Sequence, residues 1–233
     1  MATRRRVTWI LAVIGLQVMW TSAACSEPVN LLGRAAGASV ARIAAWQSII
    51  GPSRASSDLQ RAIGINRFFN EFRSVPDSEL WGVADYWATP EQVLTVGAGD
   101  CEDFALAKYM SLIRTGVAAN RLWLAYTRAL QPDKRRIESH MVLVFHSNDG
   151  RYWVLDNLRA DVVPLAQRRD LSVSTALNGS GVWHLSKTDA PVLVAGREAL
   201  PPQARRLLEA DDPGAALASA DGMSMTEDRG AVR

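Results

Sequence analysis

The chain has 233 residues, of which 48% are hydrophobic, and a formal net charge of +2. This length and composition support one globular core with extensions. The charge is nearly neutral and no basic stripe with interleaved aromatic residues occurs, which argues against nucleic acid as a partner.

The N-terminus has the pattern of an export signal. Three arginines at 4–6 precede a fourteen-residue uncharged run at 7–20, and the small residues TSAACS follow it. This order is typical of a secretory signal. The run is shorter than the roughly 20 apolar residues of a spanning helix, but an uncleaved anchor has a similar pattern. We expect residues 1–25 to be a secretory signal or an N-terminal anchor, with the folded domain at 27–200 outside the cytoplasm.

Helical spacing dominates the first part of this domain. Residues 40–73 carry two groups of apolar residues at helical intervals, and Gly51-Pro52 separates them. This pattern predicts two core-facing helices. A third helix is predicted to start at 89–92, where a threonine N-cap, a proline and a capping-box glutamine follow one another. The glycine-rich segment 97–99 should end it.

The next predicted helix begins with a cysteine among acids. Asp100 is its expected N-cap and Cys101 its first residue, and the helix should end near Gly116. A thiol at a helix N-terminus faces unpaired N–H groups, which favour the thiolate. The carboxylates of Asp100, Glu102 and Asp103 act in the opposite direction and raise the thiol pKa. Two plainer interpretations remain, namely that the cysteine is a small buried hydrophobe and that the acids only cap the helix.

Only two cysteines occur in the chain, Cys25 and Cys101. Export removes or isolates the first, so the second is the single thiol of the domain and has no internal disulfide partner. After the cysteine helix, strands are predicted at 121–127, 139–146 and 151–158. Helices followed by an antiparallel sheet indicate an α+β fold. We expect 201–233 to be a largely disordered tail.

A hairpin brings a histidine and an aspartate together. If residues 148–150 form a three-residue loop with a left-handed Gly150, then His140 opposes Leu158 and Asp156 lies diagonal to it on the same face. Diagonal neighbours are about 7–8 Å apart, within side-chain reach. A loop of two or four residues would place Asp156 on the opposite face. With Cys101, these residues can form a nucleophile, base and orienter.

Four segments resemble the bacterial transglutaminase-like cysteine peptidases: DYWATPEQV, GAGDCEDFALAKY, ESHMVLVF and YWVLDNL. The strong resemblance runs from Asp85 to Asn157. It implies a papain-like, transglutaminase-type α+β fold with N-terminal helices packed on an antiparallel sheet. It also implies that Cys101 is the nucleophile, His140 the base and Asp156 the orienting residue.

The resemblance implies calcium as well. Acids flanking the cysteine bind it in this family, and here Asp100 and Glu102 match, while Asp103 either contributes or only caps. Carboxylate oxygens are the ligands that Ca²⁺ prefers, and a bound dication would relieve the repulsion beside the thiolate. Relatives are periplasmic endopeptidases that cut a large surface adhesin near its N-terminus and release biofilms. An inner-membrane cyclic-di-GMP receptor sequesters them.

Two other functions fit the same residues. In a transglutaminase, an amine rather than water would intercept the acyl-enzyme, and the three residues do not discriminate between these outcomes. In a binding module, the fold would persist with an inactive site, although the intact Cys, His and Asp argue against this. The leading prediction is therefore a calcium-dependent cysteine endopeptidase.

Overall fold

The computed structural model describes residues 27–51, 56–131 and 136–210. The chain divides into two units, 1–35 and 36–233. The first contributes the start of helix α1 (Glu27–Ile50), and the second holds the rest of α1 and the other described elements. The predicted signal at 1–25 lies outside the described residues. Within the described ranges, no helix has the length and apolar character needed to span a membrane.

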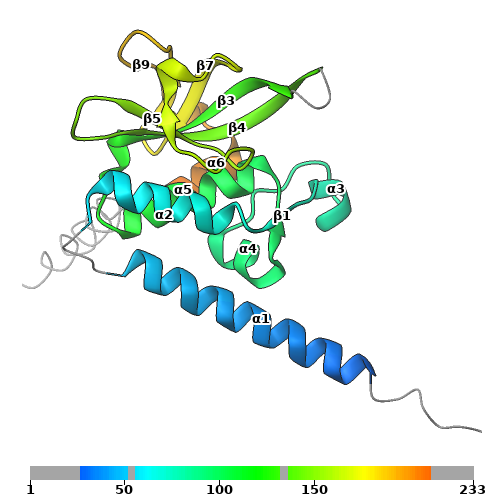
Figure 1. Ribbon diagram of the computed structural model, residues 1–233. Helices are drawn as coiled ribbons and strands as arrows, with labels where there is room; N and C mark the ends of the chain where they lie inside the picture. The colour runs from blue at the N-terminus through cyan, green and yellow to red at the C-terminus, as the bar shows by residue number, and fades with distance from the viewer. Residues whose placement is uncertain (1–26, 52–55, 132–135, 211–233) are drawn as a thin grey trace, which may run out of the picture. The chain divides into compact units, whose positions relative to one another are not determined.

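Helices α1 to α5 precede the strands of the main sheet, as predicted for an α+β fold, and α6 follows them (Figure 1). After α1 the helices are α2 (Asp58–Phe69), α3 (Asp77–Leu80), α4 (Pro90–Val96), α5 (Cys101–Arg114) and α6 (Pro202–Ala210). The short 3-10 helices are η1 (Ala119–Arg121), η2 (Leu165–Gln167) and η3 (Arg197–Ala199). Short parallel strands β1 (Arg73–Ser74) and β2 (Ala98–Gly99) pair with each other.

One seven-stranded antiparallel sheet has the order β6-β5-β4-β3-β7-β8-β9. Its strands are β3 (Leu122–Gln131), β4 (Arg136–His146), β5 (Tyr152–Leu155), β6 (Val163–Pro164), β7 (Leu171–Asn178), β8 (Gly181–His184) and β9 (Val192–Gly196). Helices α2 and α5 lie against one side of this sheet (Figure 1). The three predicted strands correspond to β3, β4 and β5.

Strand β4 lies inside the sheet, and its apolar run is buried on both faces. Met141, Leu143 and Phe145 belong to the core shared with the helices, which includes Phe69, Leu106 and Tyr109 from α2 and α5. Val142 and Val144 point to the other face, into a second cluster with Trp123 and Leu171. The period of two along a strand places alternate residues in these two cores.

Local chemistry sets the helix starts that precede the site. Thr89 caps α4, and the side chain of Gln92 completes a reciprocal capping box. The helix ends at Gly97, whose φ of 72° is the left-handed conformation that glycine adopts without steric cost. These boundaries confirm the predictions for residues 89–99.

The expectation of a disordered tail at 201–233 is wrong for its first residues. Residues 202–210 form helix α6, whose Ala204 and Leu208 are buried in the main core. Their i, i+4 spacing puts both on one helix face. Few large apolar residues accompany them, so the composition of this segment did not predict a helix. Residues 211–233 lie outside the described part of the chain. Strands β7, β8 and β9 were also not predicted.

Candidate active site

The cysteine lies at the start of α5, directly after the turn that ends α4. Asp100 is the N-cap, and its side chain accepts a hydrogen bond from the backbone N–H of Asp103, while Asp103 accepts one from the N–H of Asp100. This reciprocal capping box makes Cys101 the first helical residue, as predicted. The thiol is half-buried and free.

A cleft of about 510 Å³ brings the cysteine and a histidine together. Cys101 enters from α5, and His140 from β4. The other lining residues are Asp85, Trp87, Glu102, Tyr126, Thr127, Arg128, Ser139, Met141, Ser172 and Ser174. A molecule bound in the cleft would therefore contact both a thiol and an imidazole.

Asp156, which does not line the cleft, holds the imidazole. Its Oδ1 lies 2.9 Å from Nε2 of His140, and both side chains are buried. Because Nε2 is engaged, Nδ1 is the ring nitrogen left to exchange a proton in the cleft. Burial alone would raise the pKa of Asp156, but hydrogen bonding to His140 and its charge outweigh it and hold that pKa well below its usual range.

The hairpin has the predicted register. His146 pairs with Tyr152 and Leu143 with Leu155, and the N–H of Ser147 bonds the carbonyl of Arg151. Gly150 has a φ of 80°, so the loop has three residues and a left-handed glycine. Strand β5 ends at Leu155, one residue before the aspartate that bonds His140.

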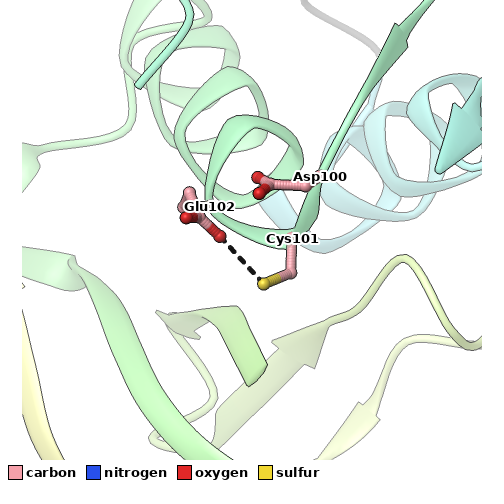
Figure 2. A group of neighbouring side chains, drawn as sticks. All are labelled: Asp100, Cys101 and Glu102. Carbon is pink, nitrogen blue, oxygen red and sulfur yellow. Dashed lines mark hydrogen bonds between the residues drawn. The ribbon is translucent and has the colours of Figure 1, made fainter. Parts of the chain in front are cut away.

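The acids beside the thiol suppress its ionisation. The Cys101 thiol donates a hydrogen bond to Oε2 of Glu102 at 3.0 Å, and Figure 2 shows the two side chains turned toward one another with Asp100 alongside. Burial raises the pKa of this thiol, and the charges of Glu102 and Asp100 raise it further. The backbone N–H of Met141 acts in the opposite direction. Without a counterion, the thiol is therefore a weak nucleophile.

More acids converge on this point than the sequence indicated. Asp77 and Asp85 join the acids of the α5 start in groups whose ligand atoms lie within 4.8 Å of one another. Oδ2 of Asp77 accepts from the N–H of Tyr86, whereas its buried Oδ1 has no hydrogen-bond partner among the described residues. Burial and the charges of neighbouring acids raise the pKa of Asp100 to about 8.

This arrangement fits a hard divalent cation. Carboxylate oxygens are the donors that Ca²⁺ prefers, and Asp77, whose Oδ1 has no partner among the described residues, belongs to two of these groups. Asp103 already has other partners, because its Oδ1 accepts from the N–H of Ala88 at 2.6 Å and its Oδ2 from Asp100. Burial raises its pKa to about 6. Asp77, Asp85, Asp100 and Glu102 are thus better candidate ligands than Asp103.

Two buried polar residues and one half-buried polar residue around the aspartate were also missed. Arg168 donates to its Oδ2, Asn70 donates to its backbone carbonyl, and Lys108 donates to the Asn70 side chain. Arg168 and Lys108 are each only 1% exposed. No local motif marks any of the three, since each acts on a residue distant in sequence. A lysine inside an apolar helix face was the only available signal.

The chain is similar to known proteins in both sequence and structure. The family model of the bacterial transglutaminase-like cysteine proteinases matches residues 48–175. Calcium-bound LapG from Legionella pneumophila has a similar structure, with a TM-score of 0.62 and 27% sequence identity, over 79% of this chain and 97% of that one. EGTA-treated LapG gives a TM-score of 0.61 and 26% identity, over 79% and 96%. No curated protein matches this sequence.

Proposed function

Because this chain belongs to the bacterial transglutaminase-like cysteine proteinases, we propose that it is a calcium-dependent endopeptidase that uses Cys101, His140 and Asp156. The proposal rests on one arrangement, in which Cys101 and His140 share a cleft and a hydrogen bond to Asp156 holds His140. Cys101 and His140 line the same cleft, and Asp156, which does not line it, bonds Nε2 of His140. The protein substrate follows from the family.

The proposed reaction forms and then hydrolyses a thioester. His140 accepts the thiol proton at Nδ1, and Sγ of Cys101 attacks the carbonyl carbon of the scissile peptide. The imidazolium returns this proton to the departing amine as the carbon–nitrogen bond breaks. A water then gives a proton to the imidazole and attacks the thioester, which releases the acid and restores the thiol. Asp156 keeps the ring orientation constant throughout.

Calcium belongs to this proposal on the strength of the donor set. Asp77, Asp85, Asp100 and Glu102 would hold the ion, and the LapG structures in calcium-bound and EGTA-treated forms are consistent with such a site. Once bound, the cation would neutralise the carboxylates that now oppose ionisation of the thiol. Mg²⁺ should substitute poorly, because it requires near-ideal octahedral geometry and loses water reluctantly.

The proposed substrate is a large surface adhesin, cut near its N-terminus in the periplasm after export of this chain. An inner-membrane cyclic-di-GMP receptor would sequester the enzyme. The substrate, the compartment and the receptor all rest on the family resemblance and on the N-terminal sequence pattern. Cell fractionation tests the compartment, and an enzyme recovered in the cytoplasm would refute it.

The experiment that tests the function uses adhesins encoded near this protein. The purified chain should cleave one of them in Ca²⁺ and stop when a chelator is added, and excess Ca²⁺ should restore cleavage. Cys101→Ala should abolish cleavage with little change in melting temperature, because the substitution removes only one sulfur from a half-buried site. Retained cleavage by the variant would refute the nucleophile. Incorporation of an amine into the substrate without cleavage would indicate acyl transfer instead.

A further inference from the structure

A buried arginine lies behind the aspartate of the proposed site. Nη2 of Arg168 is 2.7 Å from Oδ2 of Asp156, and the arginine side chain is 2% exposed. Arg168 follows η2 and precedes β7, so it comes from a part of the chain distant from the β4–β5 hairpin. It does not line the cleft. Any effect on catalysis must therefore act through another residue.

Three contacts together fix the carboxylate of Asp156. Oδ1 accepts hydrogen bonds from Nε2 of His140 and from the backbone N–H of Leu158, both at 2.9 Å. Oδ2 accepts from Arg168. A partial rotation of the carboxylate would lengthen the contact to the arginine together with those to His140 and Leu158. Arg168 therefore helps to fix the plane of the carboxylate that faces His140.

The arginine is itself held in place by a second acid. Its Nε lies 2.9 Å from Oδ1 of Asp170, and its Nη2 lies 2.7 Å from Oδ2. Lys187 donates to its backbone carbonyl at 2.6 Å. This fork-like engagement of a carboxylate is characteristic of a guanidinium and is not available to an ammonium group. The side chain thus bridges two carboxylates, one buried and one partly exposed.

Burial of this group is not fully compensated. Nη1 of Arg168 is buried without a hydrogen-bond partner among the described residues. Buried polar atoms without partners are uncommon and call for an explanation. If Arg168 only anchored the segment before β7, its contact with Asp170 would suffice. The further contact of its Nη2 with Asp156 is what a role in the site would require.

We propose that Arg168 is a positioning residue for catalysis, which fixes the carboxylate of Asp156 so that Nδ1 of His140 stays directed at the thiol. The inference rests on the proposed function, since it assumes that His140 exchanges a proton with Cys101. The charged and titratable groups around Asp156 are His140 from β4, Arg168 before β7, and Lys108 from α5.

The test compares Arg168→Met with Arg168→Lys and with Arg169→Met as the matched control, all in Ca²⁺ and on the full chain. Arg168→Met should lower kcat about 100-fold, the scale expected of a small misplacement of reacting groups, with KM unchanged because Arg168 does not touch the cleft. Arg168→Lys should fall between Met and wild type. Arg169→Met removes an exposed neighbouring charge and should keep both kcat and the melting temperature close to wild type.

A pH profile separates positioning from a structural role. The charge of Arg168 helps to hold the pKa of Asp156 low. In Arg168→Met, Asp156 should therefore become protonated at a higher pH than in wild type, and a protonated Asp156 no longer orients His140. The acid limb of the kcat profile should move to higher pH. If Arg168→Met does not fold, Arg168→Lys decides. A folded variant with the wild-type kcat and acid limb overturns the proposal, as does an equal loss of kcat in Arg169→Met.

Failure of the inference and of the proposed function are distinguishable. The rate at which iodoacetamide labels Cys101 at pH 7, followed by mass spectrometry of its peptide, needs no substrate. If His140→Ala labels as fast as wild type and Cys101→Ala still cleaves, the proposed function fails. If both of those variants lose activity but Arg168→Met matches wild type in labelling and cleavage, only the positioning role fails.

Discussion

At the scale of single residues, Cys101 faces opposing electrostatic influences. Its place at a helix start favours the thiolate, but burial and Glu102 raise its pKa. Glu102 is both the hydrogen-bond acceptor of the thiol and a candidate cation ligand. One carboxylate can therefore suppress the nucleophile without a cation and release it when a cation is bound.

Substitution Glu102→Gln should affect reactivity in opposite directions with and without calcium. In chelator, iodoacetamide should label Cys101 faster than in wild type, because a negative charge that raises the thiol pKa is gone. In Ca²⁺, labelling and cleavage should be slower than in wild type, because a ligand is lost. Glu79→Gln, an exposed acid outside the cluster, is the control and should behave as wild type. Slower labelling in chelator would contradict the argument.

At the scale of elements, α5 links the thiol to the aspartate. Cys101 begins this helix, and Lys108 lies two turns later, fully buried. Nζ of Lys108 is 2.8 Å from the side-chain oxygen of Asn70, the C-cap of α2, which donates to the backbone carbonyl of Asp156. The two helices and the end of β5 are thus connected through one buried ammonium group.

Asn70→Ala should destabilise the protein far more than Lys108→Met. The first leaves a buried ammonium without its hydrogen bond, at a cost of about 3 kcal/mol. The second removes the charge together with its desolvation penalty and should change the free energy of unfolding by only about 1 kcal/mol. Chemical denaturation measures both. If both variants lost the same free energy of unfolding, the unpaired ammonium of Lys108 would not be the source of the destabilisation.

The same pair predicts a pH dependence of stability. Burial lowers the pKa of Lys108 from 10.5 to about 7. Between these values the unfolded chain binds more protons, so this group makes the free energy of unfolding increase as pH rises from 7 toward 10. Lys108→Met should remove that contribution. Denaturation of wild type and Lys108→Met at pH 7 and pH 9 measures the difference. An equal change of the free energy of unfolding with pH in both proteins would contradict the prediction.

Helix α6 is a second element whose contribution is testable. Leu208 is 1% exposed and packs in the main core, so Leu208→Ala should cost about 3 kcal/mol of stability. Arg206, exposed on the same helix, provides the control, and Arg206→Ala should stay within about 0.5 kcal/mol. A negligible effect of Leu208→Ala would mean that α6 does not belong to the cooperative core.

At the scale of the whole molecule, the acid cluster couples metal, pH and folding. Its members come from α3, the segment before α4 and the start of α5, so a bound cation would tie three segments together. The unfolded chain separates these acids and binds the ion weakly. Calcium should therefore stabilise the fold by mass action, by about 2.7 kcal/mol at a hundredfold excess over Kd.

The acid cluster should make metal-free protein less stable from pH 4 to pH 7, below the range in which Lys108 acts in the opposite direction, and calcium should reverse this trend. The pKa of Asp100 is raised to about 8 and that of Asp103 to about 6. The folded state thus binds more protons in this range, and the stabilisation present below pH 4 is lost as pH rises through these values. Melting temperatures at several pH values, with Ca²⁺, Mg²⁺ or neither, measure the effect. Asp100→Asn should flatten the metal-free curve.

Short-range features of the molecule were predictable from the sequence. The starts of α4 and α5 depend on Thr89, Asp100 and their partners three residues on, and the hairpin register depends on a three-residue loop with Gly150. Each is decided by groups within a few residues of one another, so the pattern carries the information. The approach of His140 to Asp156 follows from that register.

Interactions between distant segments were decided only by the tertiary structure. Arg168 reaches Asp156, and Lys108 reaches Asn70, across 12 and 38 residues of sequence. Asp77 joins the acids of α5 in the same way. Such contacts depend on how whole elements pack, and no local pattern records them. The sequence by itself determined the helix starts and the histidine–aspartate register, whereas packing of α2, α3 and the segment before β7 decided which buried charges surround them.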